Sequence, residues 1–169
     1  MEAWWTIVWT TVLEEFSDLS DLKDWTRITL RLLVAALLGA LIGYDRETKN
    51  KSAGLRTHML VALGAAIFVI TPAQSGMEME DLSRVVQGII AGIGFLGAGS
   101  ILKLEHNETI HGLTTAASIW MTAAIGIAAG LGREMTATLS AAITLFVLAS
   151  LYRLESKIAA RHRSDEDDA

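Results

Sequence analysis

The amino-acid sequence predicts an all-α integral membrane protein, a bundle of five transmembrane helices preceded by a short helix at the membrane interface. Three observations support this fold class. Hydrophobic residues make up 51% of the chain, charged residues gather in short clusters between long apolar runs, and only one proline is present. An ionised side chain at the centre of a bilayer costs about 2.5–3.5 kcal/mol, so segregated charge is typical of spanning chains. Backbone groups in hydrocarbon must be bonded within their own segment, which favours helices.

The amino-terminal segment, residues 1–27, is expected to lie at the outer membrane surface, with an interfacial helix over residues 3–16. Three tryptophans favour the headgroup layer, because indole is amphipathic. They are Trp4, Trp5 and Trp9. The apolar run has no basic start and ends at Glu14 and Glu15, which argues against a cleaved signal peptide. A disordered terminus is the alternative interpretation.

The domain over residues 28–154 contains five segments that are apolar enough to span. They are 28–44, 57–70, 85–102, 113–131 and 135–152. A spanning helix needs about 20 apolar residues, with a range of about 17–25. The second segment is short and could alone form a re-entrant piece, so the parity of the count depends on it. A charged tail over residues 155–169 follows.

The distribution of basic residues supports five spans over four. Lys and Arg gather after the first span and again in the carboxyl-terminal tail, and such clusters favour the cytoplasmic side. Five spans with the amino terminus outside place both clusters in the cytoplasm, whereas four spans would place one of them outside. We therefore expect a multi-pass protein whose amino terminus is outside and whose carboxyl terminus is cytoplasmic.

Glycine pairs one helical turn apart occur on three different spans. They are Gly39 and Gly43, Gly88 and Gly92, and Gly126 and Gly130. Small residues at this spacing let helix backbones approach closely. The pattern predicts a tight bundle and a homo-oligomer, with a dimer expected.

The third span carries further glycines at Gly94, Gly97 and Gly99. Residues 92–97 match the dinucleotide fingerprint, but they lie inside an apolar span and not between a strand and a helix, so nucleotide binding is rejected. Two interpretations stay open for this span. The glycines either allow close helix packing or loosen the helix so that it lines a cavity.

Polar residues of interest stand at the ends of four spans, and the predicted topology brings them all to the cytoplasmic side. This set is the candidate cation or partner site. Its members are Asp45, Arg46, Glu47, Arg56, Thr57, His58, Ser100, Thr114, Thr115 and Ser118. Thr114 and Ser118 are expected to share a helix face and to hydrogen-bond across a helix contact.

Asp45 admits two interpretations. It could form an ion pair with Arg56 that clamps the first two spans together, or it could be a metal ligand or proton-linked carboxylate. Mg²⁺ keeps several waters and uses one or two carboxylates, so one carboxylate is a minimal magnesium site.

His106 and His111 are five residues apart and lack the spacing of a zinc helix. At the other end, Arg31 is expected to snorkel or to pair with an outer carboxylate, and Gln87 is a candidate neighbour.

Composition excludes several classes of function. The net charge is −5 without a basic stripe, so nucleic acid is not an expected partner. The chain has no cysteine, and the spans hold no paired carboxylates or Ser/His arrangement, so we expect no catalytic residues and no enzyme. No cofactor is expected beyond the Mg²⁺ that Asp45 could bind.

Four stretches in this order resemble the MgtC/SapB family of bacterial inner-membrane proteins. They are Leu33-Val-Ala-Ala-Leu-Leu-Gly-Ala-Leu-Ile-Gly43 followed by Asp45-Arg-Glu47, Ala53-Gly-Leu-Arg-Thr-His58, Gly92-Ile-Gly-Phe-Leu-Gly-Ala-Gly99, and Gly112-Leu-Thr-Thr-Ala-Ala117 with Trp120. The resemblance implies a five-helix membrane domain and a link to magnesium-limited growth and host adaptation. Two features depart from the family. Many members have Glu-Arg-Glu where this chain has Asp45-Arg-Glu47, and longer members carry a soluble carboxyl-terminal domain.

The expected function is therefore magnesium-limitation or stress adaptation, through cation sensing or through modulation of another membrane complex. A cation transporter or channel is the first alternative, although few carboxylates lie in the spans. A purely structural membrane interaction protein is the second alternative.

Overall fold

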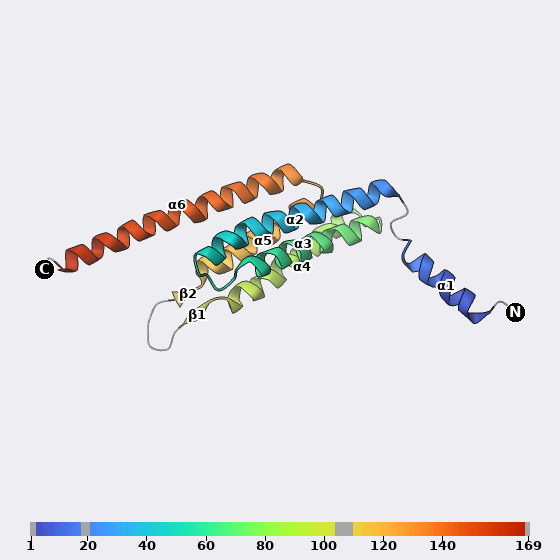
Figure 1. The fold of residues 1–169 in the computed structure, drawn as a ribbon, viewed down its shortest axis with the longest axis horizontal. Coiled ribbons are helices and arrows are strands. Elements are labelled where there is room, and N and C mark those ends of the chain that lie inside the picture. The colour runs from blue at the N-terminus through green and yellow to red at the C-terminus, as the bar shows by residue number, and fades with distance from the viewer. Residues whose placement is uncertain (1–2, 18–20, 104–109, 168–169) are drawn as a thin grey trace. The chain divides into compact units, whose positions relative to one another are not determined.

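The computed structural model describes residues 3–17, 21–103 and 110–167. Six helices and a pair of two-residue strands follow one another in these ranges (Figure 1). They are α1 Trp4–Glu15, α2 Leu22–Thr48, α3 Leu55–Gln74, α4 Met79–Gly99, β1 Leu102–Lys103, β2 Ile110–His111, α5 Leu113–Gly130 and α6 Glu134–Asp167. The chain divides into two compact units, Met1–Leu30 and Arg31–Ala169.

Four helices are long and apolar enough to cross a membrane: α2, α3, α4 and α5. The all-helical membrane architecture predicted from the sequence is confirmed at this level. The short second segment is part of α3, which has 20 residues and therefore a length of about 30 Å, enough to cross. The apolar stretch Glu134–Ser150 of α6 is shorter than these four.

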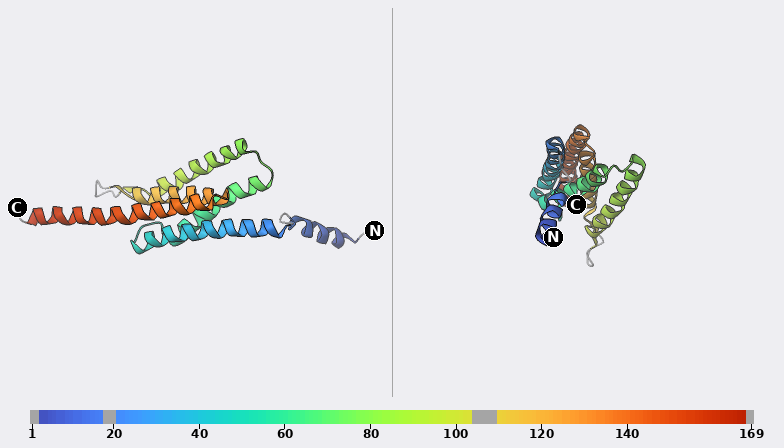
Figure 2. Two further views of the ribbon diagram at one scale, coloured as in Figure 1. Left: turned by 90° about the horizontal axis from the view of Figure 1, so that it is seen from above. Right: turned by 90° about the vertical axis from the view of Figure 1, so that its right-hand side faces the viewer.

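Helix α5 is the central helix of the second unit. It contacts α3, α4 and α6, and half of its apolar window is buried, against 17% for α4. Figure 2 shows these helices running lengthwise beside one another. Because nine of the sixteen buried hydrophobic residues described are alanines, the core is thin and the backbones lie close together.

Two glycine pairs lie where helix backbones meet. A methyl group added at Gly39 would lie 2.7 Å from the carbonyl oxygen of His58, and one at Gly43 would lie 2.7 Å from Leu55 Cα. A methyl group at Gly126 would lie 2.9 Å from Ala62 Cα, and one at Gly130 would lie 2.7 Å from the carbonyl oxygen of Ala66. These separations leave no room for a side chain, so the two pairs bring both α2 and α5 against the backbone of α3, where Gly39 and Gly126 both meet Ala62.

The glycines of α4 differ from this expectation. A methyl group would meet no atom within 4 Å at Gly88, Gly92, Gly94 or Gly99, and Gly97 lies at an ordinary contact distance of 3.6 Å from Ala116 Cβ. The prediction of close packing at these α4 positions is therefore wrong within the described chain. The physical reason is rotation of the helix about its axis, because only Leu82 and Gly97 of α4 are buried.

The same helix is continuous from Met79 to Gly99, so the expected loosening of the third span is absent. After α4, β1 and β2 pair antiparallel with Leu102 opposite His111. His106 lies outside the described residues. Gly112 follows with φ +96° and leads into α5, and its backbone packs against Ser100, so a side chain there would collide.

Candidate functional site

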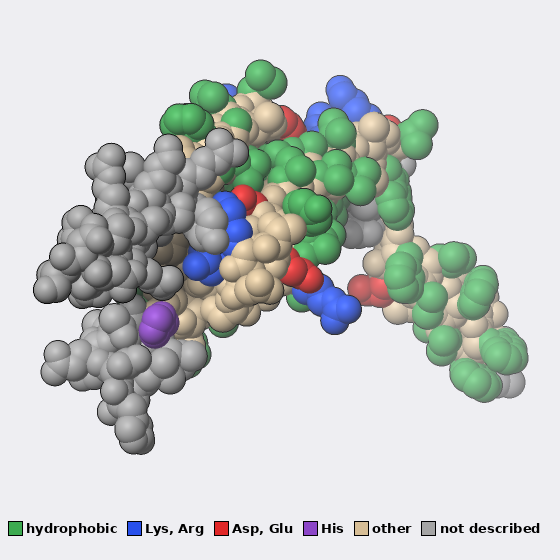
Figure 3. Space-filling view, turned by 60° about the vertical axis from the view of Figure 1, so that its left-hand side comes forward, with side chains coloured by type: hydrophobic (Ala, Val, Ile, Leu, Met, Phe, Trp, Pro, Cys, Tyr) green, Lys and Arg blue, Asp and Glu red, His purple; other side chains and the backbone are tan. Residues whose placement is uncertain are grey.

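The second unit brings the predicted polar residues to one end of the bundle. The last turns of α2 and α4 and the first turns of α3 and α5 all lie beside the β1–β2 pair (Figure 1). We call this region the polar end. It comprises Asp45, Arg46, Glu47, Lys49, Arg56, Thr57, His58, Ser100, Thr114, Thr115 and Ser118. Figure 3, in which this end comes forward, shows basic and acidic side chains next to one another rather than a surface of one sign.

Asp45 is held by a lysine that directly follows its own helix, α2. The Nζ atom of Lys49 lies 2.7 Å from Oδ1 of Asp45 and also donates to the carbonyl oxygen of Leu148 on α6, at 3.2 Å. The two side chains are 19% and 16% exposed. The expected clamp between Asp45 and Arg56 is wrong, because Arg56 is exposed and Lys49 takes the carboxylate. The pair links α2 to α6 instead.

This arrangement also bears on metal binding. The ammonium of Lys49 occupies the position beside Oδ1 that a metal cation would need. The second oxygen, Oδ2, is buried and has no hydrogen-bond partner among the described residues. No group of three or more His, Asp or Glu side chains in the described ranges could hold a metal ion. A cation at Oδ1 of Asp45 would therefore have to displace Lys49.

Glu47 binds the start of α3. Its Oε2 atom accepts a hydrogen bond of 2.7 Å from the backbone N–H of Leu55, the first residue of α3. The residue before it, Gly54, offers no side-chain cap, so the carboxylate takes the place of a cap and meets the positive end of the helix dipole. Glu47 thus joins the end of α2 to the start of α3.

His58 connects α3 to α5 and is completely buried. Its Nδ1 lies 2.9 Å from the carbonyl oxygen of Gly54, and its Nε2 lies 3.1 Å from Oγ of Ser118. A carbonyl can only accept, so Nδ1 carries a proton and donates to Gly54, which leaves Nε2 of a neutral ring able to accept from the Ser118 hydroxyl. The same hydroxyl lies 2.8 Å from the carbonyl oxygen of Thr115. Its single proton can serve only one of these two acceptors.

The expected polar contact of α5 is therefore present, but through Ser118 alone. Thr115 and Ser118 are buried, whereas Thr114 is exposed. Arg46 is the other buried polar residue at this end, and it is only 2% exposed. A buried guanidinium is rare in proteins, and here it stands one residue after Asp45.

Thr57 and Ser100 belong to a separate hollow. With Ser52 and Phe95 they line a cavity of about 400 Å³ at the ends of α3 and α4, and neither Asp45 nor His58 lines it. The Ser100 hydroxyl is bonded to the carbonyl oxygen of Gly97 at 2.7 Å. The predicted residues thus form two neighbouring groups at the polar end, and not a single site.

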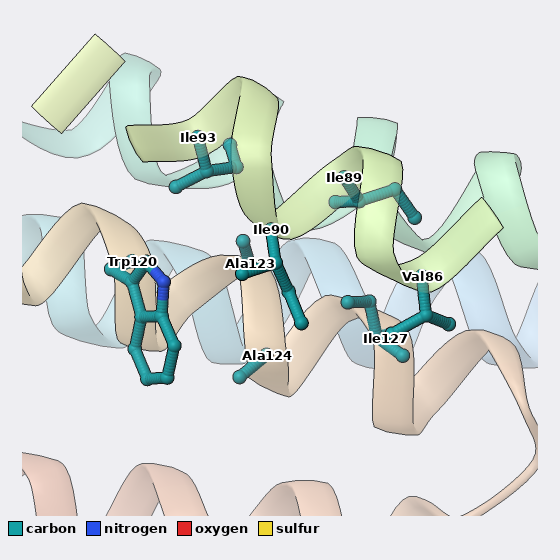
Figure 4. Close-up of a pocket in the computed structure, with 8 residues that line it drawn as sticks. All are labelled: Val86, Ile89, Ile90, Ile93, Trp120, Ala123, Ala124 and Ile127. Atoms are coloured by element: carbon teal, nitrogen blue, oxygen red, sulfur yellow. The ribbon is translucent and has the colours of Figure 1, made fainter. Parts of the chain in front are cut away.

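The cavities along the spans are apolar. One of about 190 Å³ lies between α4 and α5, and Figure 4 shows the labelled side chains that line it, all aliphatic except for one tryptophan. Another of about 570 Å³ lies between α5 and α6, where the hydroxyl-bearing residues are Thr114, Ser118 and Thr144. The carboxylates that would mark a cation path are absent from the linings of both cavities.

Arg31 holds the opposite end of α2. Its Nη1 donates to the carbonyl oxygen of Gly130, the last residue of α5, at 3.1 Å. Its Nε lies 3.9 Å from Oε1 of Glu134. Of the two expectations for Arg31, the pairing with a carboxylate is the one present, whereas Gln87 is exposed on α4. A cation at the carboxyl-terminal end of a helix also meets the negative end of the dipole.

Sequence reasoning missed Lys49, which it treated only as one of several basic residues. The spacing of four residues from Asp45 on one helix is the signal that could have revealed the pair, because side chains at i and i+4 are neighbours. The bond from Lys49 to Leu148 has no such signal, because it joins two positions that are 99 apart in the sequence.

Comparison with known proteins identifies the family. A sequence model of the MgtC family matches residues 32–157. The chain belongs to the MgtC family. It is 43% identical over 143 residues to the protein SrpB of Synechococcus elongatus, covering 78% of this chain and 79% of SrpB. No solved structure matches the chain.

Two further relatives are longer than the matched region. The putative magnesium transporter YhiD of Escherichia coli is 38% identical over 136 residues, or 76% of this chain and 62% of YhiD. The protein MgtC of Salmonella typhimurium is 44% identical over 116 residues, or 69% of this chain and 48% of MgtC. The match therefore spans about half to two thirds of these relatives.

Proposed function

We propose that this MgtC-family chain is a non-enzymatic inner-membrane protein that acts in adaptation to magnesium limitation by modulating another membrane complex through its polar end. The family supports the link to magnesium, as does the name of the relative YhiD. The observation that carries the mechanism is the 2.7 Å contact between Lys49 and Asp45. A carboxylate already neutralised by an ammonium is poorly suited to bind Mg²⁺ but remains suited to polar contacts with a protein.

The proposed topology has five spans, with the amino terminus outside and the carboxyl terminus in the cytoplasm. The fifth span would be the first part of α6, a helix that runs from Glu134 to Asp167 and is therefore about 51 Å long. Single cysteines test this arrangement, because the chain has none of its own. Ser52→Cys should react with an impermeant thiol reagent from the cytoplasmic side, and Ser17→Cys and Ser75→Cys from outside. Labelling of Ser52→Cys from outside would invert the topology.

Growth at limiting magnesium tests the role of the polar end. We expect Asp45→Asn and Lys49→Met each to reduce complementation while the protein stays in the membrane. The double variant removes both charges, so it should restore stability but not growth if this surface contacts a partner. Full growth of the double variant would reduce Asp45 and Lys49 to a structural pair. Immunoblots of membrane fractions supply the abundance control.

A cation transporter is the second candidate, favoured by the name of YhiD. Proteoliposomes that contain only this protein and a Mg²⁺-sensitive dye separate the two functions. We expect no protein-dependent flux. Saturable Mg²⁺ uptake that Asp45→Asn abolishes would establish transport and refute modulation as the primary role.

We also propose that the chain forms a homodimer through α4. Gly88, Gly92 and Gly99 share one side of α4 and meet no atom of their own chain within 4 Å, whereas α2 turns leucines outward. Those leucines are Leu30, Leu33, Leu37 and Leu41. Small outward residues suit contact with another helix better than contact with lipid tails. Gly92→Leu should leave the fold intact and shift the cross-linked dimer to monomer, and an unchanged dimer would exclude this face.

A further inference from the structure

Helix α1 has one apolar side. At 3.6 residues per turn, positions 5, 9, 12 and 16 fall on one line along the helix, flanked by positions 8 and 13. The apolar face of α1 therefore comprises Trp5, Val8, Trp9, Val12, Leu13 and Phe16. The opposite side carries the hydroxyls and the carboxylate of Thr6, Thr10, Glu14 and Ser17, with Ile7 as its one large apolar residue.

Nothing in its unit covers this face. None of the residues of α1 is buried, and Trp9 and Phe16 are 65% and 81% exposed. Helices of about 12–15 residues or fewer are marginal in water on their own, and α1 runs only from Trp4 to Glu15. A stable α1 therefore needs a surface that takes up its apolar face.

The connection to α2 restricts what that surface can be. Residues 16–21 separate α1 from the start of α2, and such a stretch reaches at most about 22 Å. Helix α2 is apolar enough to span a membrane, so α1 is tethered to the surface of the same bilayer. At its length of about 18 Å, α1 is too short to cross a hydrocarbon core of about 30 Å. The helix can lie on the membrane but cannot span it.

Composition indicates where on the membrane it lies and on which lipids. Tryptophan prefers the headgroup boundary, and three of the five tryptophans of the chain are Trp4, Trp5 and Trp9. Residues 1–22 contain five acidic residues and no Lys or Arg. Basic amphipathic helices gain affinity from anionic lipids, whereas this segment would be repelled by them.

We propose that α1 lies flat in the interface of the leaflet at which α2 begins, with its apolar face among the lipids and zwitterionic headgroups around it. This surface lies outside residues 32–157, which match the family. It supplements the spans by fixing the orientation of the outer end of α2 against the headgroup layer.

Single-tryptophan variants of the full chain in phosphatidylcholine vesicles test the proposal. Trp4, Trp5, Trp25 and Trp120 are changed to Phe, which leaves Trp9 on the apolar face. The matched control adds Trp9→Phe and Thr10→Trp, which moves the single indole to the polar face of the same turn. We expect blue-shifted emission, weak quenching by iodide and strong quenching by lipids brominated near the headgroup for the first variant. The control should show the reverse.

Three outcomes would overturn the proposal. Strong and equal quenching of the two variants by iodide would place both faces of α1 in water. Protection from iodide without quenching by brominated lipid would assign the face to a protein, either a second copy or another partner. Stronger protection when phosphatidylglycerol replaces part of the phosphatidylcholine would contradict the preference for zwitterionic lipid. Far-ultraviolet circular dichroism of both variants checks that the helix content is the same.

Discussion

The contact between α3 and α5 at Gly126 yields the sharpest prediction about stability. A methyl group there would lie 2.9 Å from Ala62 Cα and 3.0 Å from Ala62 C. Carbon atoms pack best at about 3.5–4.0 Å, so Gly126→Ala must push the two helices apart by on the order of 0.5 Å. The obstacle is backbone, which cannot rotate away as a side chain could. Overpacking of this kind costs about 1–3 kcal/mol, and we expect the upper end of that range.

Gly64→Ala is the matched control, because it makes the same chemical change inside α3 where a methyl group would meet nothing within 4 Å. Ala is favoured over Gly in a helix interior by about 0.8–1.0 kcal/mol, so this variant should be slightly more stable than the wild type. Equilibrium unfolding in mixed detergent micelles measures both free energies. Equal free energies of unfolding for the two variants would refute close packing of α3 against α5.

Three further predictions concern polar contacts and use the same unfolding assay. Lys49→Met should destabilise the protein by about 1–3 kcal/mol, which is less than the loss of one partner from a fully buried ion pair, because both side chains are partly exposed. Adding Asp45→Asn should recover most of this loss, and no recovery would mean that the broken ion pair is not its cause. Arg31→Met should cost about 1.5–3 kcal/mol because it removes a charged hydrogen bond to the carbonyl oxygen of Gly130 at the end of α5. Arg27→Met is the control, because it breaks only the exposed ion pair with Asp24, and an equally small effect of the two variants would refute the role of Arg31. Glu47→Ala should cost about 0.5–2 kcal/mol through loss of the cap on α3, whereas Glu47→Gln should cost less because its amide oxygen can still accept from Leu55; equal losses would rule out the hydrogen bond.

The membrane class and the ends of the spans could be predicted well from the sequence. The bilayer acts on the average polarity of about 20 successive residues, which is a local property of the chain. Four of the five expected segments coincide with long apolar helices, and the fifth stays a prediction because the apolar part of α6 is shorter. The convergence of Asp45, His58, Ser100 and Ser118 on one end follows from the same alternation of helix directions.

Partners across helices could not be predicted in this way. Asp45 was expected to meet Arg56, the nearest basic residue on the next span, but it bonds Lys49, four residues later and directly after the end of α2. The anchor of Arg31 on Gly130 joins residues 99 positions apart. The neighbours of a side chain depend on the rotation of its helix about the axis, and no local pattern fixes that rotation.

The glycines show most clearly what each level of structure decides. The sequence by itself determined that pairs one turn apart lie on three spans, because this is a matter of spacing. Only the tertiary structure decided that Gly39, Gly43, Gly126 and Gly130 meet neighbouring backbones while Gly88 and Gly92 border an open cavity beside α3 and touch no atom within 4 Å. The physical reason is that a glycine permits a close approach but does not cause one. The approach occurs where the whole set of helices packs with the least empty space, and that optimum depends on every helix together.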